Sequence, residues 1–410
     1  MSYSRSETHR DRKSRSQRRI RRLIALNSIL LVAVAIVVVW LFVGSNPKQS
    51  GLEADAASAP PSKAAHTPAS PAAKPSPPVE SPAPSASAGT GADSEFTPVK
   101  LAFVGDILPA ASVAQLMKKN GYDYPYREAQ SLLQAADITA GNLEAPITGR
   151  GTPAGNKQYL FRGPAEALPA LKDAGFDVFT LANNHTLDYG WVGLQDTMDA
   201  LNDHGLKHVG AGTDATEAYT PVYMESKGIT VAYIGISRVL PEPSWKAAAR
   251  HPGVADGYNP AGAEKAIRDA KKNADLVVVL VHWGIERADQ PNKDQKELGH
   301  RLIDAGADLV VGSHPHVLQG FEFYKNKWIA YSLGNFVFNT TASPKTSETG
   351  ILTAACSKTG SCSLEFQPMK AVNSQPAPLT GQAAKELLAR LSSLSTAAVF
   401  KENGQLVAKH

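Results

Sequence analysis

The chain has 410 residues, 43% of them hydrophobic, and a formal net charge of +4. Its length allows one large domain or two. The positive charge is concentrated in residues 1–22, which carry nine Lys or Arg and two acidic residues, so this tail has a charge of +7 and the rest of the chain −3. A folded part without excess positive charge is not expected to bind nucleic acid.

An apolar segment follows this basic tail. Residues 23–43 are interrupted only by Asn27 and Ser28, and as a helix they would span roughly 30 Å, the thickness of the hydrocarbon core of a bilayer. We therefore predict a single transmembrane signal-anchor helix in the cell membrane, with residues 1–22 in the cytoplasm and the C-terminal domain extracellular. A cleavable signal peptide is the alternative, although its apolar region would be shorter, about 7–15 residues.

Residues 44–97 are dominated by Ala, Pro and Ser. They lack the apolar side chains needed to offset the entropy of ordering, so we predict a disordered linker. Because prolines favour extended conformations, the linker would act as a semi-rigid spacer between the membrane and the folded part. The alternative is a plain tether with no further role.

From residue 98 onward, short apolar runs alternate with segments of helical periodicity. Gly175, Gly205 and Gly306 follow three of the helical segments and are good stop signals. Strands that alternate with helices indicate a largely parallel sheet with both faces covered. The predicted strands are 99–104, 177–181, 229–236, 276–281 and 307–311, and the predicted helices are 111–119, 166–174, 191–204, 261–272 and 294–305.

The pattern changes after Gly320. Two hairpins are predicted there, which indicates antiparallel strands added to the parallel part. We expect one domain over residues 98–372, and a C-terminal linker, helix and terminal segment, 373–410, packed on it. The hairpin strands are 321–324 with 328–331 and 351–355 with 363–367; the later helix is 383–394 and a last strand is 405–408.

Cys356 and Cys362 are the only cysteines of the chain, and the residues between them are typical of a hairpin turn. Such a turn would place the two cysteines opposite each other on paired strands. In an exported domain we therefore expect a disulfide. Two free thiols are the alternative.

Polar clusters follow several of the apolar runs directly. In open α/β sheets the ligand site lies at the carboxyl ends of the strands, so these clusters are expected to converge. Carboxylate, amide and imidazole groups in one crevice are typical of a divalent-metal centre. The clusters are Gly105-Asp106, Asn142-Leu143-Glu144, Asn183-Asn184-His185, His282-Trp283-Gly284 and Gly312-Ser313-His314-Pro315-His316.

Together with Asp188-Tyr189-Gly190 and Ser332-Leu333-Gly334-Asn335-Phe336, these clusters resemble the CapA family of capsule and poly-γ-glutamate synthesis proteins over about residues 99–370. That family resembles a branch of the calcineurin-like metallophosphatases. The resemblance implies an α/β fold in the form of a four-layer α/β/β/α sandwich. It also implies metal-assisted hydrolysis of an ester, and a role in the synthesis, export or anchoring of an anionic capsule polymer.

The resemblance also implies a set of metal ligands, with two departures from the metallophosphatase pattern. Leu108 stands where a histidine is expected, and Asn142 stands at the position of the bridging aspartate, so we take Glu144 as the replacement. One full site with a weaker second one, or a single ion, is expected. Mixed imidazole, carboxylate and amide ligands suit Mn, Fe or Zn. The implied ligands are Asp106, Glu144, Asn184, His282, His314 and His316.

The remaining polar residues receive catalytic and substrate roles. His185 would protonate the leaving group and Asp188 would orient it, although Asp188 could also be a turn residue before Gly190. Arg162, Glu286 and Asn335 are candidate substrate-binding residues. For Arg162 a salt bridge is the alternative, and for Glu286 a surface position.

Two functions of different classes follow. The first is a membrane-anchored, extracytoplasmic hydrolase acting on an anionic polymer or a phosphoester. The second is a non-catalytic subunit of the polymer synthase or export complex, with a structural or vestigial metal site. Both predict the membrane and capsule-polymer synthase subunits as partners.

Overall fold

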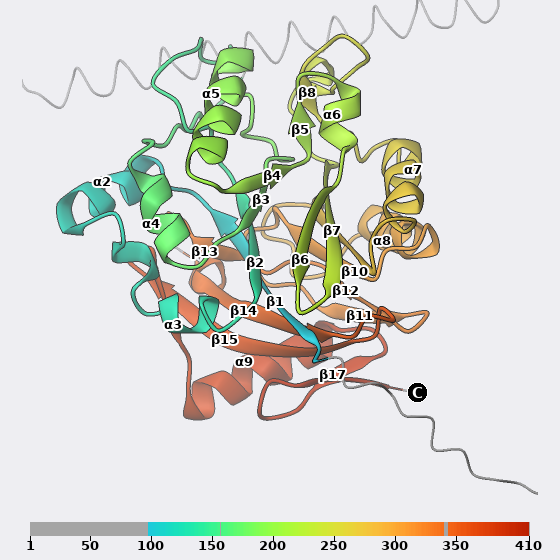
Figure 1. The fold of residues 1–410 in the computed structure, drawn as a ribbon. Coiled ribbons are helices and arrows are strands. Elements are labelled where there is room, and N and C mark those ends of the chain that lie inside the picture. The colour runs from blue at the N-terminus through green and yellow to red at the C-terminus, as the bar shows by residue number, and fades with distance from the viewer. Residues whose placement is uncertain (1–96, 156, 340–342, 410) are drawn as a thin grey trace, which may run out of the picture. The chain divides into compact units, whose positions relative to one another are not determined.

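The computed structural model describes residues 97–155, 157–339 and 343–409 (Figure 1). The predicted tail, transmembrane helix and linker therefore lie outside the described residues, apart from the last residue of the linker. Within the described part, no helix combines the length and the apolar character that crossing a bilayer requires.

The first sheet is mixed. Its strands lie in the order β16-β15-β14-β1-β2-β3-β4, and β13 also pairs with β1. The parallel strands are β1 (Val99–Ile107), β2 (Ile138–Leu143), β3 (Val178–Thr180), β4 (Lys207–Val209) and β13 (Asn335–Val337). The antiparallel strands are β14 (Glu348–Cys356), β15 (Cys362–Val372) and β16 (Gln375–Pro378).

The second sheet has a parallel centre and two antiparallel edge strands. Its order is β11-β12-β10-β9-β7-β6. The parallel strands are β7 (Ile229–Ser237), β9 (Leu276–His282), β10 (Leu309–Ser313) and β12 (Lys327–Ala330). The edge strands are β6 (Val222–Ser226) and β11 (Phe321–Tyr324).

Alternating side chains of the strands build three layers of core. In β1, Leu101 and Phe103 belong to the core between the two sheets, whereas Ala102 and Val104 face the helices. The apolar residues 276–281 of β9 are divided in the same way, because successive side chains of a strand point to opposite faces. Burying one such Val, Leu or Phe stabilises the fold by roughly 1.5–3 kcal/mol.

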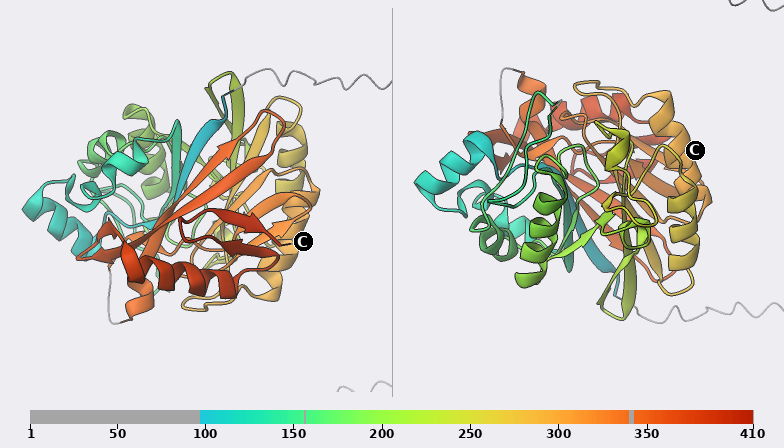
Figure 2. Two further views of the ribbon diagram at one scale, coloured as in Figure 1. Left: turned by 90° about the horizontal axis from the view of Figure 1, so that it is seen from below. Right: turned by 90° about the horizontal axis from the view of Figure 1, so that it is seen from above.

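Helices cover the outer faces of both sheets (Figure 2). On the first sheet these are α2 (Ala111–Asn120), α3 (Gln130–Leu133), α4 (Ala167–Asp173) and α5 (Gly190–Asp203). On the second they are α7 (Ala261–Ala270) and α8 (Lys293–Asp304), with the short α6 (Ala215–Tyr219) beside α7. The order of layers is therefore helix, sheet, sheet, helix.

The C-terminal segment packs on these layers. Helix α9 (Gly381–Leu394) and the hairpin of β17 (Ala398–Phe400) and β18 (Leu406–Ala408) contribute apolar side chains to the core between the sheets. The remaining short elements are β5 (Ala211–Gly212), β8 (Gly253–Val254) and three 3-10 turns, Tyr124–Tyr126, Pro243–Trp245 and Pro344–Ser347.

The predicted mixed α/β fold is confirmed, and the helices and strands expected from the sequence are present within a few residues of their predicted ends. Several short strands were not predicted, among them β4, β6, β13, β16 and β17. Strand β16 contains two prolines, which only an edge strand tolerates because proline donates no hydrogen bond. Cys356 and Cys362 face each other on β14 and β15 and form a disulfide.

Candidate metal centre

Polar side chains from both sheets meet at the carboxyl ends of their strands. Asp106 is the last residue but one of β1 and lies next to Asn142 on β2 and Asn335 on β13. His282 is the last residue of β9 and pairs with Ser313, the last residue of β10. His314 and His316 follow β10 directly. The sheet topology thus brings together residues that lie up to 229 positions apart in the sequence.

Two glycines permit the close backbone approach that this crevice needs. A Cβ atom added at Gly105 would lie 1.8 Å from the carbonyl oxygen of Gly334, and one added at Gly312 would lie 2.1 Å from that of Tyr331. The neighbouring Asp106 amide donates to the Gly334 carbonyl at 2.9 Å. Any larger side chain at either glycine would push the strand ends apart.

The backbone beyond β10 is strained. His314 has a φ of 96° and His316 a φ of 57°, both in the region that favours glycine. A non-glycine residue held there costs on the order of 1–3 kcal/mol, and such strain persists mainly at functional sites. Here it turns both imidazoles toward the strand ends.

The donor atoms form two overlapping groups. Glu144, His314 and His316 form one, and Asp106, Glu144 and His282 form the other; within each group the donor atoms lie within 4.8 Å of one another. Glu144 belongs to both groups. The structure therefore brings together five of the six predicted ligands around one shared carboxylate.

Two buried atoms of this cluster have no hydrogen-bond partner among the described residues, Glu144 Oε1 and His314 Nδ1. Leaving such an atom unsatisfied costs about 1–3 kcal/mol. A divalent cation between them would satisfy both atoms, and imidazole nitrogen with carboxylate oxygen suits Mn, Fe or Zn. The residues present therefore fit a bound metal.

Asn184, the sixth predicted ligand, lies beside the cluster. Its Oδ1 is 3.0 Å from His282 Nε2, while His282 Nδ1 is 3.0 Å from Ser313 Oγ. His282 Nε2 is also 3.8 Å from Glu144 Oε1. Rotation of the Asn184 side chain about its own bonds would release Nε2 for a cation.

Asn142 does not act as a carboxylate would at its position. Its side-chain amide donates to Asp106 Oδ1 at 2.8 Å and lies 3.4 Å from Glu144 Oε2. Its own oxygen accepts from Asn183 Nδ2 at 3.0 Å. Asn142 therefore orients both carboxylates, and Asn183 holds Asn142 in turn.

Asn335 orients His316. Its Oδ1 lies 2.9 Å from His316 Nδ1, and its Nδ2 donates to the His316 carbonyl. Asp106 Oδ2 lies 3.2 Å from the same Nδ1, so the Nε2 atom of the ring faces Glu144 Oε1 at 3.9 Å. This contact fixes the orientation of the His316 ring, and the substrate-binding role of Asn335 stays a prediction.

The protonation states of two histidines of the cluster suit metal binding. Burial lowers the pKa of His314 to about 3 and holds that of His282 well below 6.5, so both rings are neutral ligands at neutral pH. Burial, with Asp106 nearby, raises the pKa of Glu144 well above 4.5. Burial opposes the charged form of His316, but its hydrogen bond to Asp106 raises its pKa above the ordinary value.

His185 and Asp188 form a buried pair beside the crevice. His185 Nδ1 lies 2.7 Å from Asp188 Oδ2, and the ring packs on Phe161 at 4.5 Å between centroids. Because the backbone amide of Phe161 also donates to Asp188 Oδ2, the carboxylate is fixed in place. Asp188 is therefore positioned to orient His185. It also lies in the turn that leads into helix α5, so the alternative role of a turn residue fits its position as well.

Lys157 was not predicted from the sequence. Its Nζ lies 2.5 Å from Asp188 Oδ1 and 2.8 Å from His185 Nδ1, and 5.4 Å from the centre of the Trp245 ring. Burial lowers the pKa of Lys157 and that of His185, and the lysine charge lowers the latter further. Its segment carries no motif, so only the fold reveals it.

The two other candidate substrate residues lie outside the cluster. Glu286 is exposed, and its charge raises the pKa of His316. Arg162 is exposed and its guanidinium lies 4.6 Å from the centre of the Tyr189 ring. No salt bridge of Arg162 is present among the described residues.

The two packed sheets and the strand-end cluster define an α/β protein with a candidate metal centre. The model of the family described as bacterial capsule synthesis protein PGA_cap matches residues 100–340. The chain therefore belongs to this family. It is 34% identical over 311 residues to the PGA biosynthesis protein CapA of Bacillus subtilis (strain 168), which covers 74% of this chain and 80% of that protein.

A second relative is the capsule biosynthesis protein CapA of Bacillus anthracis, 36% identical over 287 residues, or 68% of this chain and 69% of that protein. Solved structures are more distant. A phosphatase of Mycoplasma pneumoniae aligns with a TM-score of 0.41 and 14% identity, over 68% of this chain and 96% of that one. The NAD nucleotidase NadN of Haemophilus influenzae aligns with a TM-score of 0.42 and 14% identity, over 73% of this chain and 57% of that one.

Proposed function

We propose that this protein is a membrane-anchored, extracytoplasmic, metal-dependent hydrolase that acts in the synthesis, export or anchoring of a capsular polymer such as poly-γ-glutamate. The observation that carries the proposal is the convergence of carboxylate and imidazole donors on Glu144, with two buried donor atoms left without a partner. Two relatives, a PGA biosynthesis protein and a capsule biosynthesis protein, support the choice of polymer.

Mn, Fe or Zn would be held by Glu144 together with His314 and His316, or by Glu144 together with Asp106 and His282. Asn184 would complete the second set from its place beside His282. Two ions would share Glu144, whereas a single ion would use one set. When bound, the metal would supply Lewis-acid polarisation of the carbonyl or phosphoryl group under attack.

His185 would hold and move a proton at its Nε2 atom. Asp188 Oδ2, 2.7 Å from Nδ1, would accept the Nδ1 hydrogen, and the neutral ring would then present a bare Nε2. Because burial lowers the pKa of His185, the ring is neutral at neutral pH and accepts a proton before it can give one to a leaving group. Lys157 stabilises the Asp188 carboxylate that fixes this tautomer.

The test is a bacterium that carries His185→Ala, compared with His251→Ala, an exposed histidine outside the site. We expect His185→Ala to change the amount or length of the surface polymer at normal protein abundance, and His251→Ala to leave both unchanged. A wild-type polymer in the His185→Ala strain contradicts a catalytic role.

A non-catalytic subunit of the synthase or export complex is the second candidate. The observation that favours it is Asn142, which offers an amide hydrogen to Asp106 where the metallophosphatase pattern has a bridging carboxylate. In that case deletion of the whole chain abolishes the polymer, whereas His185→Ala does not. Cross-linking in intact cells would then capture membrane-embedded synthase subunits with both the wild type and the variant.

The extracellular location is tested separately. The proposed helix over residues 23–43 would leave the domain outside the cell, so protease added to intact cells should remove it while residues 1–22 stay protected. Protection of the whole chain until the cells are lysed would contradict this arrangement.

A further inference from the structure

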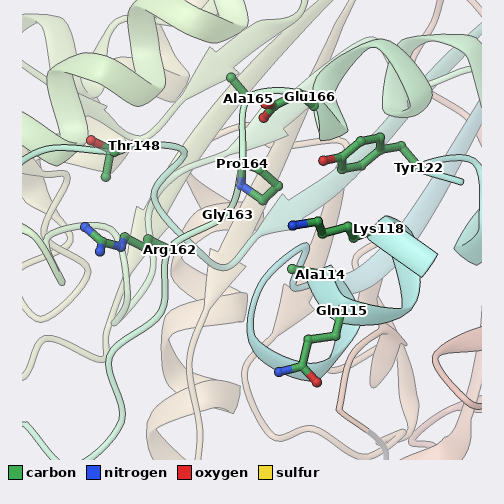
Figure 3. Close-up of a pocket in the computed structure, with 11 residues that line it drawn as sticks. Ala114, Gln115, Lys118, Tyr122, Thr148, Arg162, Gly163, Pro164, Ala165 and Glu166 are labelled. Carbon is green, nitrogen blue, oxygen red and sulfur yellow. The ribbon is translucent and has the colours of Figure 1, made fainter.

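A second hollow lies beside the metal centre. It has a volume of about 780 Å³ and is bounded by helix α2, the loop after β2 and the segment that leads into α4. Figure 3 shows Lys118 on one side of it and Arg162 on the other, with Thr148 and Glu166 also on its walls. This volume lies within the roughly 300–1,000 Å³ typical of ligand pockets.

The walls of this pocket continue into the metal centre. Phe161 packs on the His185 ring, and the next residue, Arg162, lines the pocket. The loop that carries Glu144 continues to Thr148 and Gly149 on the pocket wall, and it is bridged to the other wall through Ile147 and Gly163. A ligand in the pocket would therefore lie next to the crevice.

The charges on the pocket wall are uncompensated. Within the described residues the side chains of Lys118, Arg162 and Glu166 make no ion pair or hydrogen bond, whereas the nearby Arg150 side chain is paired with Asp196. Arg162 is only stacked on Tyr189, which leaves its N–H groups available. Two cations and one carboxylate thus line the same pocket.

We propose that this pocket binds a peptide-like polyanion, a chain of amide-linked units that each carry a carboxylate, and leads it to the metal centre. Lys118 and Arg162 would bind carboxylates of the chain, and Glu166 would accept an amide N–H between them. A phosphate polymer offers no such N–H, so it would leave the Glu166 carboxylate without a donor beside the negative charges of the polymer. This inference rests on the proposed function, because the ligand that it assigns to the pocket is the polymer substrate of the metal centre.

The test is the binding of a short γ-linked glutamate oligomer to the purified full-length protein, followed by calorimetry. A glycerol phosphate oligomer of equal charge is the parallel probe. We expect the double variant Lys118→Gln/Arg162→Gln to raise the Kd of the glutamate oligomer roughly tenfold or more. The matched control is Lys119→Gln/Arg250→Gln, two exposed cations outside the pocket, for which we expect a change under about twofold.

A second variant blocks the pocket without changing charge. Gly149 lies on its wall, and a Cβ added there meets no atom within 4 Å. Gly149→Phe is therefore expected to fold normally, to keep the metal and to lose the oligomer.

Metal uptake, measured as a rise in Tm with Mn in the same preparations, separates the possible failures. If the wild type and both pocket variants take up metal and bind the glutamate oligomer equally well, the pocket assignment is wrong and the metal centre stands. The same holds if the wild type takes up metal but does not bind the oligomer. Equal or tighter binding of the phosphate oligomer overturns the ligand class. A wild type that takes up no metal contradicts the proposed function itself.

Discussion

Glu144 is the residue whose replacement should affect the metal centre most. It is fully buried and belongs to both groups of donor atoms, whereas each other donor belongs to one. Without metal, burial and the neighbouring Asp106 raise its pKa and disfavour its charge. Glu144→Gln keeps the shape, removes that unfavourable charge and removes the shared ligand. We expect the metal-free variant to be at least as stable as the metal-free wild type.

With metal bound, the wild type should be more stable than Glu144→Gln. A ligand at a hundredfold excess over its Kd stabilises a protein by about 2.7 kcal/mol. For a folded part of this size, 1 kcal/mol corresponds to roughly 2 °C in Tm, so the wild type should gain roughly 5 °C. Because Glu144 contributes to both donor groups, Glu144→Gln should lose nearly the whole gain. His282→Ala removes a donor from one group only and should keep part of the gain if two ions bind.

The assay is thermal unfolding by calorimetry with and without Mn, Fe or Zn. Glu128→Gln, at an exposed position, makes the same charge change and should keep the full rise in Tm. A Glu144→Gln protein that gains as many degrees as the wild type would refute the shared-ligand role of this carboxylate.

Three further outcomes follow from other contacts. Asn335→Ala frees the His316 ring, so metal affinity measured by chelator competition should fall about 10–100-fold; unchanged affinity would show that Asn335 does not orient the ligand. Burial opposes the charge of Asp137, but Lys227 at 2.7 Å and a backbone amide lower its pKa below 3.8. The contribution of Asp137 to stability is therefore present above about pH 3.8 and is lost as the pH falls through the lowered pKa of its carboxyl group. Asp137→Asn should cost about 1 kcal/mol or less in urea unfolding at neutral pH, and the difference from the wild type should vanish in acid; a difference independent of pH would contradict this ion pair. Replacing both cysteines with serine opens a small loop and should lower the free energy of unfolding by about 2 kcal/mol, and an unchanged Tm would show that the disulfide does not contribute.

The fold could be predicted where the pattern is strong. Strand β9 is a continuous apolar run and α8 has clear periodicity with a capping box at its start. Strand β2 gave a weaker signal because its apolar run is interrupted by Gly141 and Asn142, small or polar residues beside the candidate site. The short edge strands carry little apolar surface of their own, and the strand beside them decides their pairing.

The candidate site could be predicted as a set of strand ends, because parallel strands end at a common edge. The hydrogen bonds that orient its side chains could not be predicted from the sequence. Asn335 reaches His316 only because β13 pairs with β1. Lys157 lies in a loop without periodicity, and its direction is set by Asp188 and Trp245, which are distant in sequence. The catalytic and substrate roles of these residues stay predictions.

The most direct test is a crystal of the protein grown with Mn and measured for anomalous scattering. We expect an anomalous peak within coordination distance of the Glu144 carboxylate, with His314 and His316 or Asp106 and His282 as its other ligands. A crystal with no peak between these side chains, or with metal only elsewhere on the surface, would contradict the metal centre.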